Sequence, residues 1–556
     1  MFYENKLWIG TNGDNKVWIL PEMANRHGLI AGATGTGKTI TLKVLAESFS
    51  DMGVPVFLAD VKGDLAGMCC PGTASDSMDK RIQELRLEGS GFSYKSYPVC
   101  FWDIFAREGL PLRTTISDMG PDLLARLMDL NPTQSDILSI VFKIADDEGL
   151  LLLDTKDLRS MLNYVGENNK EYASRYGNMA KQSIHAILRG LVALEEQGAD
   201  LFFGEPALDI RDWFRTGGFG GQGVINILQS ESLINNPMMY STFMLWMLSE
   251  LFEILPEAGD CGKPKMVFFF DEAHLLFKGA PKALIFKIEQ VVKLIRSKGV
   301  GVYFITQSPG DIPDEVLGQL GNKIQHALRA YTPADQKAVK AAADSFRINP
   351  AFDTREVLPQ LGIGEALVSV LLEDGTPSVV ERVWILPPQS QMGPVDEAVR
   401  EKETKENLLY AKYGTMYDRD SAYEFLERKL KQEAQEEQEK EEEEARIKAE
   451  EKAEKEARKE EERQARALAR EEEKRAREEA KQAEKKAKEE AREKEAAARA
   501  RKQAAASVAK TAGGTIGREV GNEIGKSIGG SFGKRLGGNL GASIGRGILG
   551  TLFGRK

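Results

Sequence analysis

The chain has 556 residues, a formal net charge of −10 and 42% hydrophobic residues. A single hydrophobic core stops growing at about 250–300 residues, so this length predicts more than one domain. The four cysteines are too few to cross-link such a chain and show no spacing typical of zinc ligands, which excludes a disulfide scaffold and a structural zinc domain. The first residues lack the pattern of a signal peptide, and no run of about 18 apolar residues predicts a transmembrane helix. We therefore expect a cytoplasmic protein.

The composition divides the chain into three parts. Residues 1–430 alternate apolar strand-like runs, turns and helix-period stretches, which predicts an α/β domain, with a net charge of about −14. Residues 431–510 consist almost entirely of Glu, Lys, Arg, Ala and Gln, and residues 511–556 are rich in glycine. The globular part is acidic, whereas nucleic-acid-binding domains usually carry a basic patch.

A nucleotide-binding motif follows the first predicted strand, residues 27–31. The octapeptide that starts at Gly32 matches the pattern G-x-x-x-x-G-K-[ST] in full and precedes a helix-period stretch through Phe49. Backbone N–H groups of such a loop close around phosphate oxygens at the N-terminus of a helix. We expect Lys38 to reach the β and γ phosphates of ATP and Thr39 to hold Mg²⁺. The predicted nucleotide-binding residues are Gly32, Ala33, Thr34, Gly35, Thr36, Gly37, Lys38 and Thr39.

Two further segments precede the second acidic motif. The strand predicted at residues 56–60 ends in Asp60 beside a glycine turn, and this carboxylate either faces the nucleotide or caps the turn. Residues 110–215 carry apolar residues at i, i+3, i+4 spacing, which predicts a helical insertion between the core strands.

Two adjacent carboxylates follow the apolar run at residues 265–270, which predicts a buried parallel strand. We expect Asp271 to hold Mg²⁺ and Glu272 to act as the general base that polarises the attacking water. A cap at the end of a strand would explain one carboxylate better than two. The pair therefore favours hydrolysis over binding alone.

The strand predicted at residues 300–305 leads into Thr306, Gln307 and Ser308. A polar side chain at the carboxyl end of a parallel strand points into the crevice where nucleotides bind in this fold class. Gln307 is therefore a candidate catalytic sensor of the γ-phosphate, and a loop cap is the alternative.

These segments resemble those of the HerA/FtsK superfamily of P-loop ATPases, and more narrowly the bacterial family with a HerA-like helicase C-terminal domain. The similar stretches include MANRHGLIAGATGTGKT, VFLADVKGDLAG, FFFDEAHLLF and GVYFITQSPGDIP, and the resemblance covers about residues 5–430. It implies a RecA-like core that forms a hexameric ring and binds ATP at subunit interfaces.

The resemblance also implies an arginine supplied by the neighbouring subunit. Arg296 and Arg329 are the candidates, although each could equally be a surface ion-pair residue. Relatives pump double-stranded DNA and partner a nuclease, with the help of an N-terminal β-barrel. Only 37 residues precede Lys38 here, too few for such a barrel, so the resemblance leaves a nuclease partner open.

The two remaining parts carry no catalytic pattern. Residues 431–510 contain only two large aliphatic residues, so we expect a solvated charged helix or a partly frayed linker rather than a coiled coil. Glycine then recurs at every fourth position from 513 to 545, each time after an apolar residue from position 517 onward. Close backbone approach at such glycines predicts self-association or contact with a membrane surface, and a flexible glycine-rich tail is the alternative.

Two functions from different classes follow. The first is an ATP-driven motor that translocates or remodels double-stranded DNA. The second is an ATPase that remodels a partner other than nucleic acid, at a peripheral membrane site reached through the glycine repeat. A protein that uses ATP only as a structural ligand is disfavoured, because Lys38, Thr39, Asp271 and Glu272 are all present.

Overall fold

The computed structural model describes residues 1–13, 15–218, 220–235, 237–259, 261–277 and 282–501. The chain forms two compact units, of which the first is Met1–Glu437 and the second begins at Gln438. The predicted glycine-repeat tail, residues 511–556, lies outside the described residues. Within the described part of the chain, no helix is long and apolar enough to cross a membrane.

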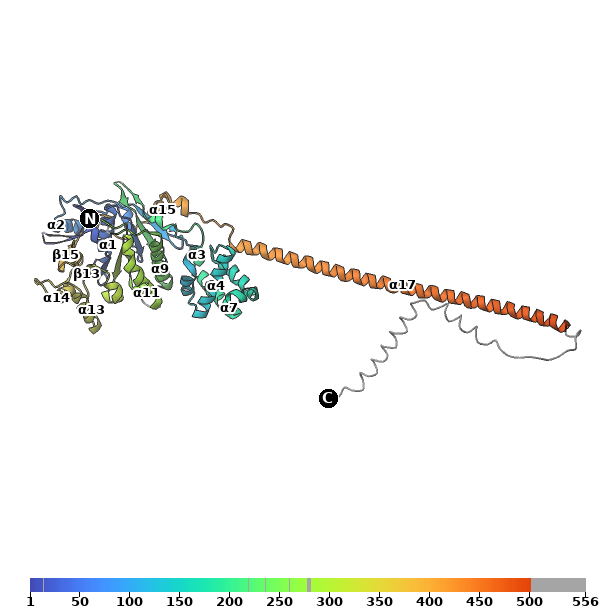
Figure 1. Cartoon of the computed structure of the whole chain (residues 1–556). Coiled ribbons are helices and arrows are strands. Elements are labelled where there is room, and N and C mark those ends of the chain that lie inside the picture. The colour runs from blue at the N-terminus through green and yellow to red at the C-terminus, as the bar shows by residue number, and fades with distance from the viewer. Residues whose placement is uncertain (14, 219, 236, 260, 278–281, 502–556) are drawn as a thin grey trace, which may run out of the picture. The chain divides into compact units, whose positions relative to one another are not determined.

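One large mixed sheet forms the centre of the first unit (Figure 1). Its order is β1-β2-β15-β14-β13-β4-β12-β11-β5-β10-β6-β7, and β3 pairs with β2. The strands are β1 (Phe2–Tyr3), β2 (Lys6–Asn12), β3 (Asn15–Ile19), β4 (Gly28–Ala31), β5 (Val56–Asp60), β6 (Val99–Asp103), β7 (Leu110–Pro111), β10 (Ile225–Gln229), β11 (Met266–Phe270), β12 (Val300–Thr306), β13 (Asn322–His326), β14 (Glu365–Ser369) and β15 (Glu381–Ile385). A separate hairpin joins β8 (Thr216–Gly217) to β9 (Gln222–Gly223).

The sheet is parallel from β13 through β4 to β7 and antiparallel from β14 to the N-terminal strands. The parallel part confirms the predicted α/β fold, and all four predicted strands are present. Because these strands run in one direction, the ends of β4, β5, β11 and β12 meet at one edge of the sheet. This carboxyl edge carries the sequence motifs.

Alternating side chains of β11 fill two different cores. Val267 and Phe269 pack on one face with α1 (Lys38–Asp51), and Phe268 and Phe270 pack on the other. The second face is covered by α9 (Pro237–Ile254) and α11 (Lys282–Ile295). All five β11 residues are therefore buried, as expected for a strand covered on both faces.

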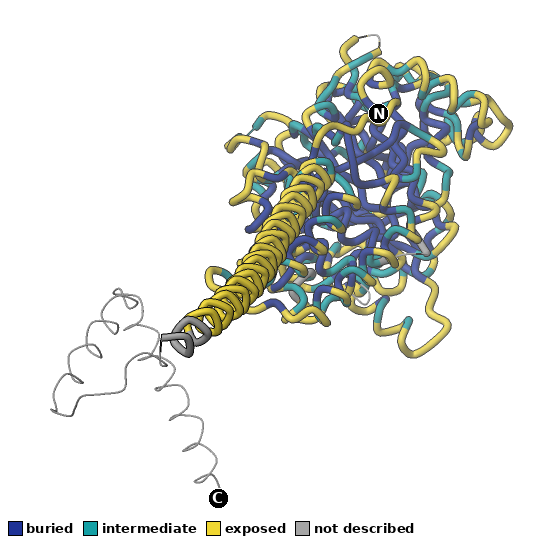
Figure 2. The backbone as a smooth tube through the Cα atoms, turned by 90° about the vertical axis from the view of Figure 1, so that its right-hand side faces the viewer, coloured by how far each residue is buried: buried dark blue, intermediate teal, exposed yellow. Residues whose placement is uncertain are grey.

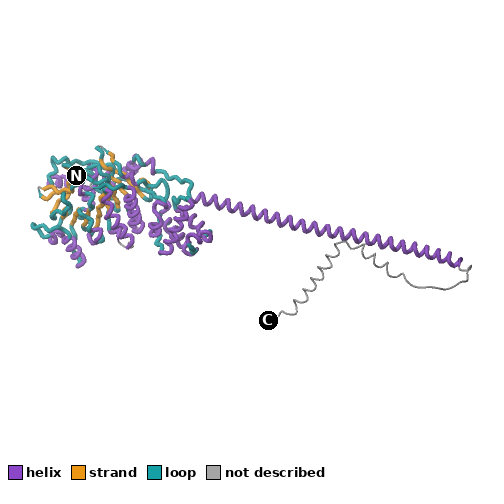
Figure 3. The backbone as a smooth tube through the Cα atoms, in the orientation of Figure 1, coloured by secondary structure: helices purple, strands orange, loops and turns teal. Residues whose placement is uncertain are grey.

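The predicted insertion is helical, and its helices pack together beside the sheet (Figure 3). Its apolar residues join the same core as α9, so the insertion is not a separately packed body. Its helices are α3 (Ile116–Leu127), α4 (Pro132–Glu148), α5 (Thr155–Glu167), α6 (Asn169–Tyr176), α7 (Lys181–Glu195) and α8 (Ala199–Phe202). The remaining α-helices of the first unit are α2 (Asp76–Glu84), α10 (His274–Phe277), α12 (Asp314–Leu317), α13 (Pro333–Asp344), α14 (Thr354–Val357), α15 (Glu397–Glu406) and α16 (Tyr410–Tyr413).

The charged segment is a continuous helix of 80 residues, α17 (Ala422–Arg501). It begins before the predicted start at Lys431, because Ala422 and Leu426 in its first turns are buried in the core of the first unit. Its later turns are exposed as far as residue 494 (Figure 2) and carry i,i+4 ion pairs such as Glu444–Lys448 and Glu484–Lys488. Each such pair adds about 0.2–0.5 kcal/mol to the stability of a helix, so the solvated helix is the form that the structure adopts.

Two leucines of α17 test where the helix is anchored. Leu426 is 2% exposed and Leu468 is 63% exposed. Leu426→Ala leaves a cavity in the core and should lower the free energy of unfolding of the first unit by about 2–5 kcal/mol. Leu468→Ala is the matched control and should change it by less than about 0.5 kcal/mol, since surface substitutions have small effects. Urea unfolding followed by tryptophan fluorescence measures both; equal effects would contradict the anchoring of the helix at Leu426.

Candidate nucleotide-binding site

The P-loop, residues 32–37, joins the end of β4 to the start of α1, as its sequence predicts. Gly37 stands directly before the helix with φ at 112°, a conformation that L side chains rarely adopt. Lys38 is buried, and its Nζ donates hydrogen bonds to the carbonyl oxygens of Gly32 at 2.7 Å and Ala33 at 3.0 Å. The lysine is therefore folded back across its own loop, where phosphate oxygens would otherwise be its partners.

His326, the last residue of β13, packs against Gly32 of the P-loop. A Cβ on Gly32 would come within 2.5 Å of the His326 Cβ, so only glycine allows this approach. The His326 Nδ1 donates to the carbonyl oxygen of Glu365 at 2.9 Å, and its Nε2 accepts from the Thr41 hydroxyl at 2.8 Å. A carbonyl can only accept, so these partners fix the neutral tautomer. Burial lowers the pKa of His326 to about 4.

The two predicted catalytic carboxylates follow β11 and face different surroundings. Asp271 is 4% exposed, and burial raises its pKa to about 7. Its Oδ1 accepts a hydrogen bond from the backbone N–H of Glu272 at 2.9 Å. Glu272 has φ at 47°, which turns its side chain out of the line of the strand. Asp271 is therefore deeply buried, whereas the side chain of Glu272 can reach neighbouring elements.

Three side chains surround the Glu272 carboxylate. Lys62 Nζ lies 2.6 Å from Oε1, His274 Nδ1 lies 3.3 Å from Oε2, and Gln307 Nε2 donates to Oε2 at 3.4 Å. Burial by itself raises the pKa of Glu272. The hydrogen bond and the charge of Lys62 lower it, and Gln307 and His274 lower it further. Together these contacts outweigh burial, so the pKa of Glu272 lies below its usual value. Sequence reasoning found Gln307 and missed Lys62 and His274.

Asp60 caps the turn that follows β5, which settles the alternative left open by the sequence. Its carboxylate accepts hydrogen bonds from the backbone N–H groups of Lys62 at 3.2 Å, Gly63 at 2.8 Å and Leu65 at 2.9 Å. This cap fixes the backbone of Lys62 at the carboxyl edge of the sheet. The pattern Asp-Val-Lys-Gly at the end of a strand is the feature of the sequence from which Lys62 could have been found.

A cavity of about 430 Å³ opens beside the P-loop. Its lining combines the P-loop, the end of β12 and the segment after β13, and consists of Ala33, Thr34, His274, Gln307, Ser308, Asp311, Leu328, Arg329, Asp335 and Ala338. Gln307 therefore borders both the cavity and Glu272, whereas the cap of the following turn is made by Ser308 and Asp311.

The two candidate arginines lie at opposite edges of the sheet. Arg329 lines the P-loop cavity and donates a hydrogen bond from Nη1 to the carbonyl oxygen of Pro359 at 2.6 Å. Arg296 lies before the amino end of β12, so it is remote from the P-loop of its own chain. A role in a neighbouring subunit stays a prediction for both residues.

The residues at the carboxyl edge fit a Mg²⁺ ion. Thr39, in the first turn of α1, would supply a hydroxyl, and Asp271, directly after β11, would supply a carboxylate. Mg²⁺ prefers oxygen ligands and usually takes one or two from protein and the rest from water and phosphate. Within the described residues, no cluster of three or more His, Cys, Asp or Glu side chains could hold a metal ion.

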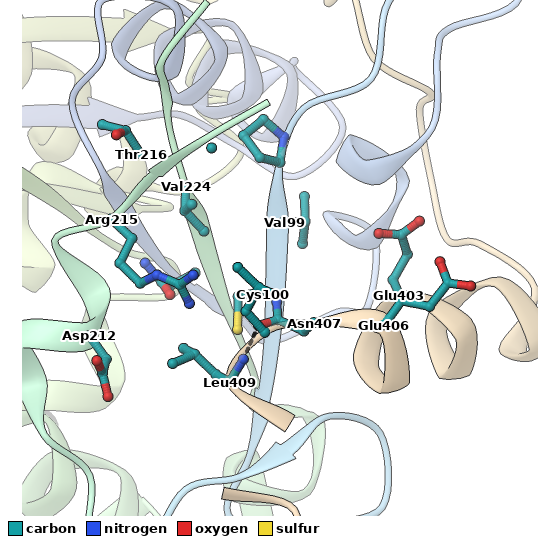
Figure 4. Close-up of a pocket in the computed structure, with 14 residues that line it drawn as sticks. Val99, Cys100, Asp212, Arg215, Thr216, Val224, Glu403, Glu406, Asn407 and Leu409 are labelled. Atoms are coloured by element: carbon teal, nitrogen blue, oxygen red, sulfur yellow. Dashed lines mark hydrogen bonds between the residues drawn. The ribbon is translucent and has the colours of Figure 1, made fainter. Parts of the chain in front are cut away.

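A second cavity of about 350 Å³ lies at the opposite edge, beside the amino ends of β6 and β10 (Figure 4). Asp212 and Arg215 approach from the segment before β8, and Glu403 and Glu406 from α15. Cys100 at its wall is buried, and burial raises its pKa. The P-loop and the acidic pair are absent from its lining, so this cavity does not belong to the nucleotide site.

The family described as "Helicase HerA-like C-terminal" matches residues 5–478. The chain belongs to the HerA-like helicase C-terminal family. The match contains the P-loop, the acidic pair and Gln307, and it continues into α17.

Similar proteins include a helicase and a probable helicase. A DNA double-strand break repair helicase HerA of Sulfolobus acidocaldarius is 22% identical over 367 residues, 65% of this chain and 65% of the relative. The probable helicase MJ1565 of Methanocaldococcus jannaschii is 23% identical over 352 residues, 62% of this chain and 60% of the relative. The matched region therefore spans less than two thirds of the length of these two relatives.

A comparison with solved structures finds matches at low sequence identity. The plasmid coupling protein TrwB in complex with ADP and Mg²⁺ has a TM-score of 0.45 at 13% identity and covers 68% of this chain and 88% of TrwB. VirB4 of Thermoanaerobacter pseudethanolicus has a TM-score of 0.44 at 17% identity and covers 68% of this chain and 96% of VirB4.

The buried His326 gives this HerA-like domain a dependence on pH. The pKa of a free histidine, 6.5, is higher than the folded value of about 4, so the unfolded chain binds the proton more tightly. Between these values stability should fall as the pH falls, by up to about 1.4 kcal/mol per pH unit for this group. Urea unfolding at pH 7.5 and pH 5 should therefore show a smaller pH effect in His326→Gln than in the wild type.

His185→Gln is the matched control, because His185 is an exposed residue of α7. It should leave the pH effect of the wild type unchanged. An equal pH effect in His326→Gln and the wild type would contradict the neutral, buried state of His326.

Proposed function

We propose that this chain is a Mg²⁺-dependent ATPase of a ring-forming motor that translocates or remodels double-stranded DNA. The observation that carries the proposal is the convergence of Lys38, Asp271, Glu272 and Gln307 at one edge of the sheet, next to a cavity. Phosphate-binding loop, acidic pair and polar sensor are the parts that phosphoryl transfer to water requires. The named relatives are DNA helicases or probable helicases, which supports DNA as the substrate of the motor.

In this proposal each side chain has a distinct role. Lys38 leaves the carbonyl groups of its own loop and binds the β and γ phosphates. Thr39 and Asp271 would hold Mg²⁺, which would supply positive charge against the phosphates. Glu272 accepts a proton from the attacking water, and Gln307 orients that water against the γ-phosphate.

Hydrolysis with and without DNA tests the proposal. Purified protein should hydrolyse ATP in the presence of Mg²⁺, and double-stranded DNA should raise kcat several-fold at low salt, with less effect as salt screens the phosphates. Glu272→Gln should lower kcat by about 10²–10⁴-fold while it retains nucleotide binding, because only the general base is lost. A phosphate-release assay measures the rates.

Glu373→Gln is the matched control, since Glu373 is exposed and outside the nucleotide site. If hydrolysis is present but indifferent to DNA at every salt concentration, the DNA motor is wrong. The second candidate, a membrane-surface ATPase, is favoured by the glycine repeat of the sequence. In that case anionic vesicles should raise the rate, and deletion of residues 513–556 should abolish the rise.

A mixing experiment tests the arginine from a neighbouring subunit. Arg329→Ala should lower kcat by about 10³-fold or more if Arg329 stabilises the transition state. Mixing this inactive variant with Glu272→Gln should restore activity, because some interfaces then combine an intact Glu272 with an intact Arg329. The same pair of experiments with Arg296→Ala decides between the two arginines; no recovery in either mixture would contradict an arginine supplied in trans.

A further inference from the structure

The Lys62–Glu272 ion pair is the shortest contact of the proposed general base. Lys62 Nζ lies 2.6 Å from Oε1, whereas the contacts from His274 and Gln307 measure 3.3 and 3.4 Å. Lys62 therefore occupies one oxygen of the carboxylate that, in the proposed function, accepts a proton from water. A carboxylate held by an ammonium group is a weaker base, which agrees with the lowered pKa of Glu272.

Lys62 also stands within reach of the place that a terminal phosphate takes. A general base lies about 3 Å from the attacking water, and that water lies about 3–3.5 Å from the atom it attacks. A cation on Glu272 is therefore only a few ångströms from the γ-phosphate of bound ATP. In addition, the pKa of Lys38 is lowered, mainly by burial and then by the positive charge of Lys62. The two ammonium groups are therefore close enough to repel each other.

The structure allows Lys62 to change partners without a change of fold. Its backbone is fixed by the cap that Asp60 makes, and its side chain is 42% exposed. The terminal phosphate carries more negative charge than a carboxylate, and Lys is a common phosphate ligand. Rotation of the side chain alone would move its ammonium group from Glu272 to the phosphate, while His274 and Gln307 keep the carboxylate in place.

We infer that Lys62 exchanges its partner on ATP binding, from Glu272 to the γ-phosphate. ADP lacks this phosphate and leaves the pair intact. Lys62 thereby contributes to the discrimination of ATP from ADP and frees the general base only when a hydrolysable phosphate is present. The inference rests on the proposed function for the hydrolysis step, whereas its binding step requires no turnover.

A binding cycle on the full chain tests the exchange. The probes are ADP and an ATP analogue with a non-hydrolysable β–γ imido bridge, measured by calorimetry with Mg²⁺. Lys62→Met should weaken binding of the analogue about tenfold and change binding of ADP by less than about twofold. Glu272→Gln removes the pair that the analogue must break, so it should tighten binding of the analogue about fivefold and leave ADP unchanged.

The double variant decides the matter. With Lys62→Met present, Glu272→Gln should no longer tighten binding of the analogue, because there is no ion pair left to break. An equal effect of Glu272→Gln in both backgrounds, or equal losses of analogue and ADP on Lys62→Met, would overturn the exchange and leave Lys62 as a fixed clamp.

Two controls separate this result from general damage. Lys6→Met changes an exposed lysine of β2 and should alter neither affinity, and Lys62→Arg should restore most of the preference for the analogue. Thermal unfolding of each variant identifies any loss of fold. If the wild type hydrolyses ATP but the effects of Lys62→Met and Glu272→Gln on binding of the analogue are independent, only the exchange is overturned. If the two effects depend on each other but the wild type does not hydrolyse ATP, only the proposed ATPase is overturned.

Discussion

Charge compensation at the carboxyl edge of the sheet is the constraint on which the site depends. Asp271 and Glu272 follow a fully buried strand, and carboxylates in such a place are costly unless cations face them. Lys62 meets Glu272 directly, and Lys38 lies within the same field. The edge therefore places two carboxyl groups and two lysine side chains close together.

The P-loop depends on strands that are distant in sequence. His326 at the end of β13 leaves no room for a side chain at Gly32, and the N–H of Gly364 donates to the carbonyl oxygen of Thr36 at 3.1 Å. Gly364 stands directly before β14, where the sheet changes from parallel to antiparallel. The antiparallel part thus contributes to the shape of the nucleotide site as well as extending the sheet. A movement of β14 relative to β4 would therefore change the position of the P-loop through this hydrogen bond.

Local patterns predicted most of this site, and contacts between distant segments account for the rest. The P-loop, the acidic pair and Gln307 were predictable because each is a short motif at the end of an apolar run. Lys62 and His326 were not, since their roles arise when β5 meets β11 and when β13 meets β4. The predicted start of α17 is too late, because the change in composition near residue 431 comes after the helix has begun. Its true first turns differ from a loop mainly in two buried side chains, Ala422 and Leu426.

The exposed length of α17 has a consequence for the heat response of the protein. Beyond its first turns the helix has no core of its own, so its hydrogen bonds break one after another, without a single transition. The packed first unit unfolds cooperatively, as compact domains do. Far-ultraviolet circular dichroism, to which 80 helical residues contribute, would therefore drift on warming long before the tertiary structure melts. A single melting temperature taken from ellipticity would mix two unrelated processes.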